Sequence, residues 1–106
     1  MKKSIIYRYS DENDLENIVN ILKENELPFE DINLSKIKFI LAIDNKALIG
    51  CIGLEPYEEN GLLRSFAVKK SHRNLGIGNE LIQYLTSYSK QVGLVNLHLL
   101  TNTAEK

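Results

Sequence analysis

The chain has 106 residues, of which 43% are hydrophobic and 25% charged, and its formal net charge at pH 7 is -1. These values fit one globular domain, residues 1–106, and argue against nucleic-acid binding through a broad basic face. No apolar run approaches the ~20 residues that a membrane-spanning helix needs. The single cysteine, Cys51, excludes an internal disulfide, so we expect a cytoplasmic location.

The first third of the sequence predicts a strand followed by an amphipathic helix. Apolar and polar residues alternate over residues 5–9, which is typical of a strand. Ser10 or Asp11 can cap the following helix, whose apolar residues recur at helical spacing: Leu15, Ile18, Val19 and Leu22. We expect Pro28 to end this helix, and residues 28–35 to form either a second short helix or an irregular loop.

The middle of the chain predicts three strands joined by tight turns. Residues 38–43 and 47–55 flank a turn at residues 44–46, which is a β-hairpin pattern. Pro56 is expected to close the second of these strands. A further strand is expected over residues 62–68.

A long helix is predicted over residues 76–92, with Gly93 at its C-terminal end. A last strand starts at Leu94 or Val95 and runs to Thr101. Because a helix connects two strands here, we expect the last strand to lie parallel to residues 62–68. The element order predicts an α/β fold of the α+β type, with a mixed sheet.

The loop that begins the long helix contains two glycines, in the order Arg73-Asn74-Leu75-Gly76-Ile77-Gly78. Backbone amides at a helix start can hold a pyrophosphate, and glycine lets the backbone approach it closely. A local basic cluster precedes and joins the loop: Lys69, Lys70, His72 and Arg73. The alternative reading is a glycine-containing helix start beside a solvated basic turn. Other phosphate-binding loops are excluded because their glycine and lysine spacings are absent.

The stretch LLRSFAVKKSHRNLGIGNELIQYL, residues 62–85, resembles the GNAT superfamily of N-acetyltransferases. Residues 73–78 match that family's Arg/Gln-x-x-Gly-x-Gly/Ala loop, and the order of elements agrees over residues 5–101. The pattern is most similar to the small arsenic-resistance-type acetyltransferases. The resemblance implies a GNAT-like acyl-CoA N-acyltransferase fold. It also implies acetyl-CoA as co-substrate, direct transfer of the acetyl group to an amine of a small molecule or peptide, and no metal.

The resemblance further implies where the cofactor lies. The strand over residues 62–68 would splay from the last strand, and the pantetheine arm would pair with the backbone of Phe66, Ala67 and Val68. The pyrophosphate would take amides from six loop residues: Arg73, Asn74, Leu75, Gly76, Ile77 and Gly78.

Two charged residues near the predicted splay are candidates for chemistry on the acceptor side. Glu55, at the end of a strand, is the candidate base that removes the amine's proton directly or through water; the alternative is a solvent-facing carboxylate. Arg64 is a candidate contact to an anionic substrate; the alternative is a paired surface arginine. With one cysteine and scattered histidines, the sequence has no metal-ligand set.

GNAT proteins usually continue beyond the position that aligns with Thr101, where many have an asparagine. We therefore expect a fold truncated after the fifth strand: a shortened form, a truncated gene product, or a domain completed by another chain. An uncovered edge predicts a homodimer or other homo-oligomer, with Leu97, Leu99 and Leu100 near the contact. The alternative function is a non-catalytic acyl-CoA-binding or partner-interaction module.

Overall fold

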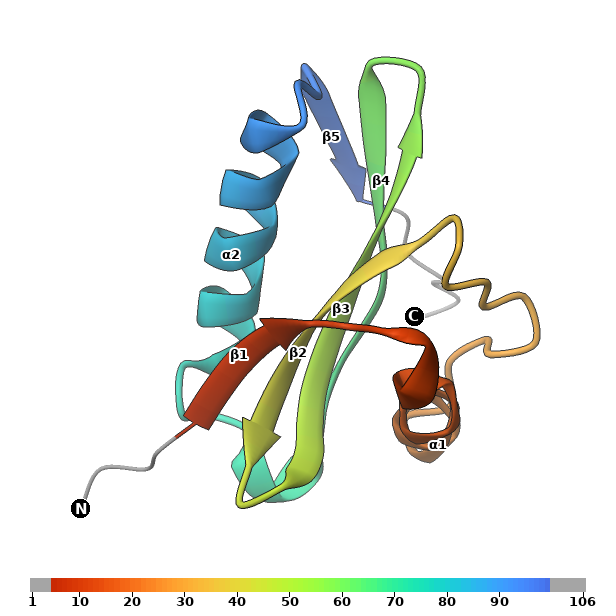
Figure 1. The fold of residues 1–106 in the computed structure, drawn as a ribbon. Coiled ribbons are helices and arrows are strands. Elements are labelled where there is room, and N and C mark those ends of the chain that lie inside the picture. Colours follow the sequence, from red (N-terminus) through yellow and green to blue (C-terminus); the bar gives the residue numbers. More distant parts are fainter. Residues whose placement is uncertain (1–4, 100–106) are drawn as a thin grey trace.

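The computed structural model describes residues 5–99 and shows, within them, a five-stranded sheet with one α-helix on each face (Figure 1). The elements follow the chain as β1 Ile5–Tyr9, α1 Leu15–Glu24, β2 Lys38–Asp44, β3 Ala47–Tyr57, β4 Asn60–Val68, α2 Ile77–Gln91 and β5 Asn96–Leu99. Two short 3-10 turns, η1 Glu12–Asp14 and η2 Lys70–His72, precede α1 and α2.

The strands lie in the sheet in chain order, β1 to β5. The first four pair antiparallel, and β5 pairs parallel with β4 after the crossover through α2. This arrangement confirms the predicted mixed α/β fold. The β4–β5 pairing covers only the first part of β4, from Asn60 to Leu63. The rest of β4, residues 64–68, therefore has no partner strand on that side within residues 5–99.

The core has two halves, one on each face of the sheet. On the α1 face, Ile18 and Leu22 pack with Phe39, Leu41 and Cys51. On the other face, side chains of α2 pack against the sheet in a second cluster that includes Ile52, Leu54, Leu81 and Leu85. Burying each such aliphatic or aromatic side chain contributes roughly 1.5–3 kcal/mol. These contacts hold both helices in place, so their ends near β4 are fixed relative to the sheet.

The prediction that α1 continues to Pro28 is wrong, because α1 ends at Glu24. Glu26 adopts a left-handed φ of 58°, and the next amide, of Leu27, donates to the Leu22 carbonyl at 2.9 Å. This is the pattern of a Schellman motif, which needs one left-handed residue but not a glycine.

For residues 28–35 the sequence allowed either a second short helix or an irregular loop. The structure shows a loop made of turns between α1 and β2, and no second helix forms there. Its apolar side chains pack against the α1 half of the core: Leu27, Phe29, Ile32 and Leu34.

Two strand boundaries also differ from those expected. Pro56 does not close β3 but lies within it, beyond Leu54, the last β3 residue that pairs with β2. A strand with one free edge tolerates proline there. β4 begins at Asn60, two residues earlier than expected. Gly93, with φ of 83°, follows the last turn of α2 as predicted.

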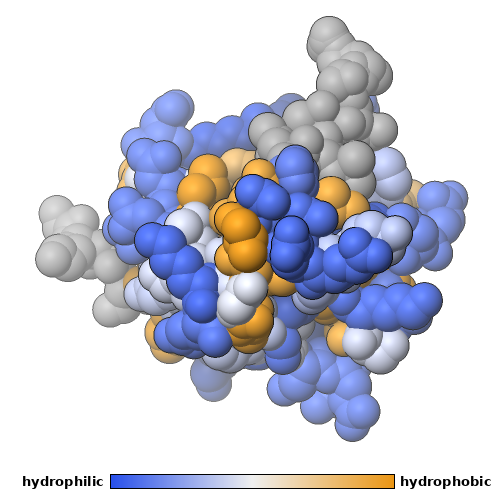
Figure 2. All heavy atoms as spheres, turned by 90° about the horizontal axis from the view of Figure 1, so that it is seen from above, coloured by the Kyte–Doolittle hydropathy of each residue, from blue (hydrophilic) through white to orange (hydrophobic). Residues whose placement is uncertain are grey.

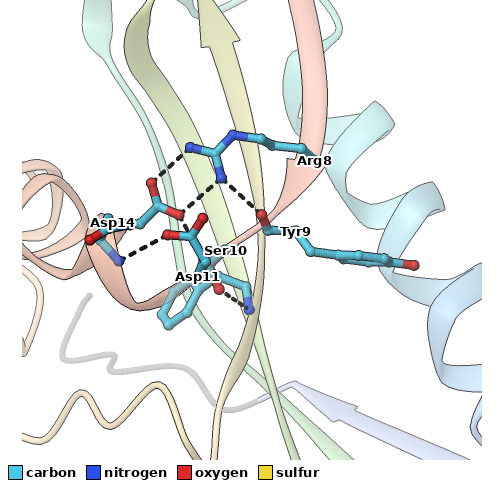
Figure 3. A network of polar contacts seen from close by, with 7 residues as sticks. Arg8, Tyr9, Ser10, Asp11 and Asp14 are labelled. Carbon is cyan, nitrogen blue, oxygen red and sulfur yellow. Dashed lines mark hydrogen bonds and ion pairs between the residues drawn. The ribbon is translucent and has the colours of Figure 1, made fainter.

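A network of charged groups joins β1 to the start of α1 (Figure 3). Two Arg8 nitrogens donate to the Asp14 carboxylate at 2.8 and 2.9 Å, and the Asp11 amide donates to it at 2.7 Å. The Asp11 side chain accepts from the Asn13 amide at 2.9 Å and also from the backbone of Asp14, so Asp11 and Asp14 form a reciprocal capping box. The hydrogen bonds from Arg8 lower the pKa of Asp14 below its ordinary 3.8, against the effect of burial.

Candidate functional site

A β-bulge interrupts β4 just after its pairing with β5 ends. One β3 residue, Ile52, faces two β4 residues, Ser65 and Phe66, and Ser65 has a left-handed φ of 55°. Such a bulge bends a strand and redirects its polar groups. Since β4 last pairs with β5 at Leu63, the bulge lies where β4 leaves its neighbour.

Beyond the bulge, alternate backbone groups of β4 point to the open edge. The Lys69 amide donates to the Ile49 carbonyl of β3 at 2.9 Å. Because backbone polar groups alternate along a strand, the N–H and C=O groups of Val68 and Phe66 point away from β3. This edge can therefore pair with an extended ligand, as it would with another strand.

The start of α2 lies beside this open edge. The first helical hydrogen bond described there runs from the Glu80 amide to the Gly76 carbonyl at 3.1 Å. The amides of residues 77–79 therefore precede the first intrahelical bond and remain available as donors. Gly76 has φ of 81° and no side-chain cap, and a Cβ added there would meet nothing within 4 Å. A Cβ on Gly78 would come within 3.2 Å of the Phe66 ring, so this glycine permits close packing.

A cavity of about 410 Å³ joins the open edge of β4 to the start of α2. Nearly all residues expected to bind the cofactor line it, and only Leu75 does not. Two further residues line it: Asn25, which was not expected at the site, and His72, which the sequence predicted only as part of the neighbouring basic cluster. The full lining consists of Asn25, Phe66, Ala67, Val68, His72, Arg73, Asn74, Gly76, Ile77 and Gly78.

The two side chains that begin the loop are both held by hydrogen bonds. Arg73 Nε donates to the Val68 carbonyl at 3.1 Å, and Arg73 Nη2 donates to Asn25 Oδ1 at 2.6 Å. His72 Nε2 lies 2.8 Å from Asp44 Oδ2, which ties the loop to the β2–β3 turn. Asn25 is 48 positions before Arg73 in the chain, so no local sequence signal could have placed it here.

Glu55 and Arg64 lie outside the cavity and contact each other. Arg64 Nη1 donates to Glu55 Oε1 at 2.9 Å, and Nη2 donates to Asp31 Oδ2 at 2.6 Å. Burial lowers the pKa of Arg64, but its hydrogen bonds to Asp31 and Glu55 raise it overall. The hydrogen bond from Arg64 lowers the pKa of Asp31. The structure thus brings both candidate residues into one network with the loop before β2, in which Arg64 is paired with two carboxylates. Its role as a substrate contact stays a prediction.

Cys51 lies under the bulge and is fully buried. Its Sγ donates to the Ser65 carbonyl at 3.4 Å. Burial raises the pKa of the Cys51 thiol to about 12. A thiol held in this way is a packing group and a poor nucleophile.

Within residues 5–99, none of the helices combines the length and apolar character needed to cross a bilayer. In the same part of the chain, no three or more His, Cys, Asp or Glu side chains gather in a way that could hold a metal ion.

Comparison with solved structures shows the same fold in known acetyltransferases. A GNAT-family acetyltransferase from Staphylococcus aureus Mu50 gives a TM-score of 0.77 at 22% identity, over 92% of this chain and 73% of that one. The PaiA N-acetyltransferase of Thermoplasma acidophilum, solved with coenzyme A, gives 0.78 at 19% identity, over 95% and 81%. A predicted acetyltransferase from Clostridium acetobutylicum, solved with acetyl-CoA, gives 0.75 at 15% identity, over 92% and 81%. At these identities the likeness concerns the fold alone.

No curated protein sequence matches the chain. The model of the acetyltransferase (GNAT) family, by contrast, matches residues 7–105. The match includes both helices, the bulged strand and the loop at the start of α2. Because it spans nearly the whole chain, this protein belongs to the acetyltransferase (GNAT) family.

Proposed function

We propose that the protein is an acetyl-CoA-dependent N-acetyltransferase that transfers the acetyl group directly to an amine of a small molecule or peptide. The observation that carries this proposal is the cavity that joins the open edge of β4 to the start of α2. Family membership supports acetyl transfer, and two of the similar structures were solved with coenzyme A or acetyl-CoA. We also propose a cytoplasmic location, where acetyl-CoA and a reduced cysteine would both be present.

In this proposal the two ends of the cavity bind different parts of the cofactor. The pyrophosphate lies against the backbone of residues 73–78, where the available amides at the start of α2 and the dipole of that helix favour an anion. The Arg73 amide is the exception, since it donates to the Lys70 carbonyl at 3.4 Å. The pantetheine arm pairs with the outward backbone groups of Phe66 and Val68. Ala67, whose polar groups face β3, forms part of the wall. Leu75 does not line the cavity, and the proposal keeps for it only a contact through its backbone amide.

The reaction needs a neutral amine and support for the thioester oxygen. The amine nitrogen attacks the thioester carbonyl carbon, a C–N bond forms, and the C–S bond breaks with its electron pair on sulfur. Backbone amides that face the open edge at the bulge, such as that of Phe66, are placed to stabilise the negative charge that develops on oxygen. The proton of the amine passes to a base, and the thiolate of coenzyme A takes up a proton.

Glu55 is the proposed base, acting directly or through water. It lies on β3 opposite Leu62, in the part of β4 that pairs with β5 and close to where that pairing ends, and its side chain is 33% exposed. Arg64 holds one oxygen, Oε1, so proton transfer would use the other. Arg64 remains a proposed contact to an anionic substrate, with one restriction. An anionic acceptor would have to compete with Glu55 and Asp31 for its guanidinium.

Two measurements on the purified chain test the proposal. Calorimetry with coenzyme A should show binding, and acetyl-CoA with a panel of amines should release free thiol at a rate that depends on the amine. Binding without turnover would favour the alternative function, a non-catalytic acyl-CoA-binding or partner-interaction module. Absence of binding to coenzyme A would contradict both functions.

A further inference from the structure

Arg73 is held by two neutral oxygen atoms at the edge of the cavity. Nε uses its hydrogen on the Val68 carbonyl, and Nη2 uses one hydrogen on Asn25 Oδ1. A guanidinium has five N–H donors, so both donors of Nη1 and one of Nη2 remain. These remaining donors, two on Nη1 and one on Nη2, can donate to the oxygens of a phosphate.

Asn25 is itself fixed by α1. It is the C-cap residue of this helix, and its Nδ2 donates to the Ile21 carbonyl at 2.9 Å. Its backbone amide also reaches the carbonyls of Ile21 and Leu22, at 3.2 and 3.1 Å. The position of Oδ1 is therefore set by a helix that packs on the sheet, and not by the loop that carries Arg73.

The kind of partner matters as much as its position. Arg64 is paired with two carboxylates, which compensate its positive charge. Asn25 and Val68 offer only neutral oxygens to Arg73. They restrict the side chain and leave its full charge available to an anion in the cavity.

From this geometry we propose that Asn25 is a positioning residue for coenzyme binding, which holds Arg73 ready for the phosphates. The inference rests on the proposed function. Without Asn25, the exposed Arg73 side chain keeps one tether and must lose more rotamer freedom when the phosphates bind. An immobilised side chain of this kind corresponds to about a five- to tenfold change in affinity.

A double-mutant cycle measured by calorimetry with coenzyme A tests the proposal. We expect Asn25→Ala to weaken binding about five- to tenfold, and Arg73→Ala to weaken it about 10- to 100-fold. In the double variant, Asn25→Ala should add no further loss, because it acts through Arg73. An equal loss in the presence and absence of Arg73 would overturn the proposal.

A second variant separates positioning from helix capping. Asn25→Gly also removes Oδ1, and glycine at this C-cap residue, whose φ is −98°, changes the stability of α1 differently from alanine. Both variants should lose the same affinity although their melting temperatures differ; losses that follow the melting temperature would overturn the proposal. Asn20→Ala, on the exposed part of α1, is the matched control and should bind as the wild type does. If the wild type binds coenzyme A and Asn25→Ala binds it equally well, this inference alone is contradicted. If the wild type does not bind coenzyme A, the proposed function is contradicted.

Discussion

At the scale of single residues, the two glycines of the loop have different physical roles. Gly76 is needed for its left-handed backbone, at φ of 81°, and the space around it is open. Gly78 lets the Phe66 ring pack closely, because a Cβ there would come within 3.2 Å of the ring. A substitution at Gly76 therefore tests the chemistry of the site with little steric disturbance, provided that the new residue tolerates a positive φ.

Gly76→Asp should weaken coenzyme A binding by at least about tenfold, because a carboxylate would lie where phosphate is expected. Gly76→Asn is the matched control, since asparagine has the same shape and also tolerates the left-handed region. It should keep most of the affinity. Calorimetry on both variants, after thermal unfolding has shown that they fold, measures the difference. Equal affinities of the two variants for coenzyme A would contradict the proposed position of the phosphate beside Gly76.

Glu55→Gln should lower turnover about 100-fold if Glu55 is the base, within the usual range for general base catalysis. Glutamine keeps an oxygen that can accept from Arg64, so the network should survive. The assay compares the pH–rate profiles of both proteins with an accepted amine. Glu58→Gln, in the exposed turn after β3, serves as control. An unchanged profile for Glu55→Gln would rule out the role.

At the scale of elements, the capping box of η1, the turn that leads into α1, makes stability depend on pH. The Asp14 pKa is lowered in the folded protein, so ionised Asp14 stabilises the fold above a pH of about 4. This contribution is lost as the pH falls through the folded-state pKa, which lies below 3.8.

We expect Asp14→Asn to lower the free energy of unfolding at pH 7 by about 1–2 kcal/mol, because Arg8 is partly exposed and only part of the pair is lost. Between about pH 5 and pH 2.5, its stability should fall less than that of the wild type. Urea unfolding at several pH values measures both effects. Parallel pH dependences would show that Asp14 does not contribute as described.

The elements themselves were predictable because their signals are local. Alternation marked β1, helical spacing and Gly93 marked α2, and the glycine-spaced loop marked the start of that helix. The end of α1 was not predictable, because its left-handed residue is Glu26. Glutamate has no preference for that conformation, unlike glycine or asparagine. Contacts between residues that are distant in the sequence could not be predicted from it either. Arg64 with Asp31, 33 positions apart, is visible only once the fold is known.

At the scale of the whole molecule, apolar side chains are exposed where α2 ends and β5 begins. Figure 2 views this end and shows apolar atoms among hydrophilic ones. Val92 is 48%, Val95 69% and Leu97 37% exposed. These residues extend the surface on which we expect contact between copies of the chain. Two other residues named in the sequence predictions, Leu100 and Thr101, lie outside the described residues.

We predict that the purified chain forms a homo-oligomer through this surface, because a second copy could cover its apolar side chains. Light scattering should give the mass of a dimer at micromolar concentration. Val95→Glu should shift the protein toward the monomer. Ile6→Glu, which places the same charge at a 62% exposed position on β1, should not. A monodisperse monomer for the wild type would contradict the prediction.

Because of where Cys51 lies, the folded chain should react very little with thiol reagents. The chain has one cysteine, and it is sealed beneath the bulge with its pKa raised to about 12. Reagents that detect thiolates near neutral pH would therefore report free coenzyme A and very little of the protein itself. When the sheet opens, the same residue becomes accessible with an ordinary pKa. One colour reaction can thus follow turnover in the folded enzyme and, with no acetyl-CoA present, count the molecules that have unfolded.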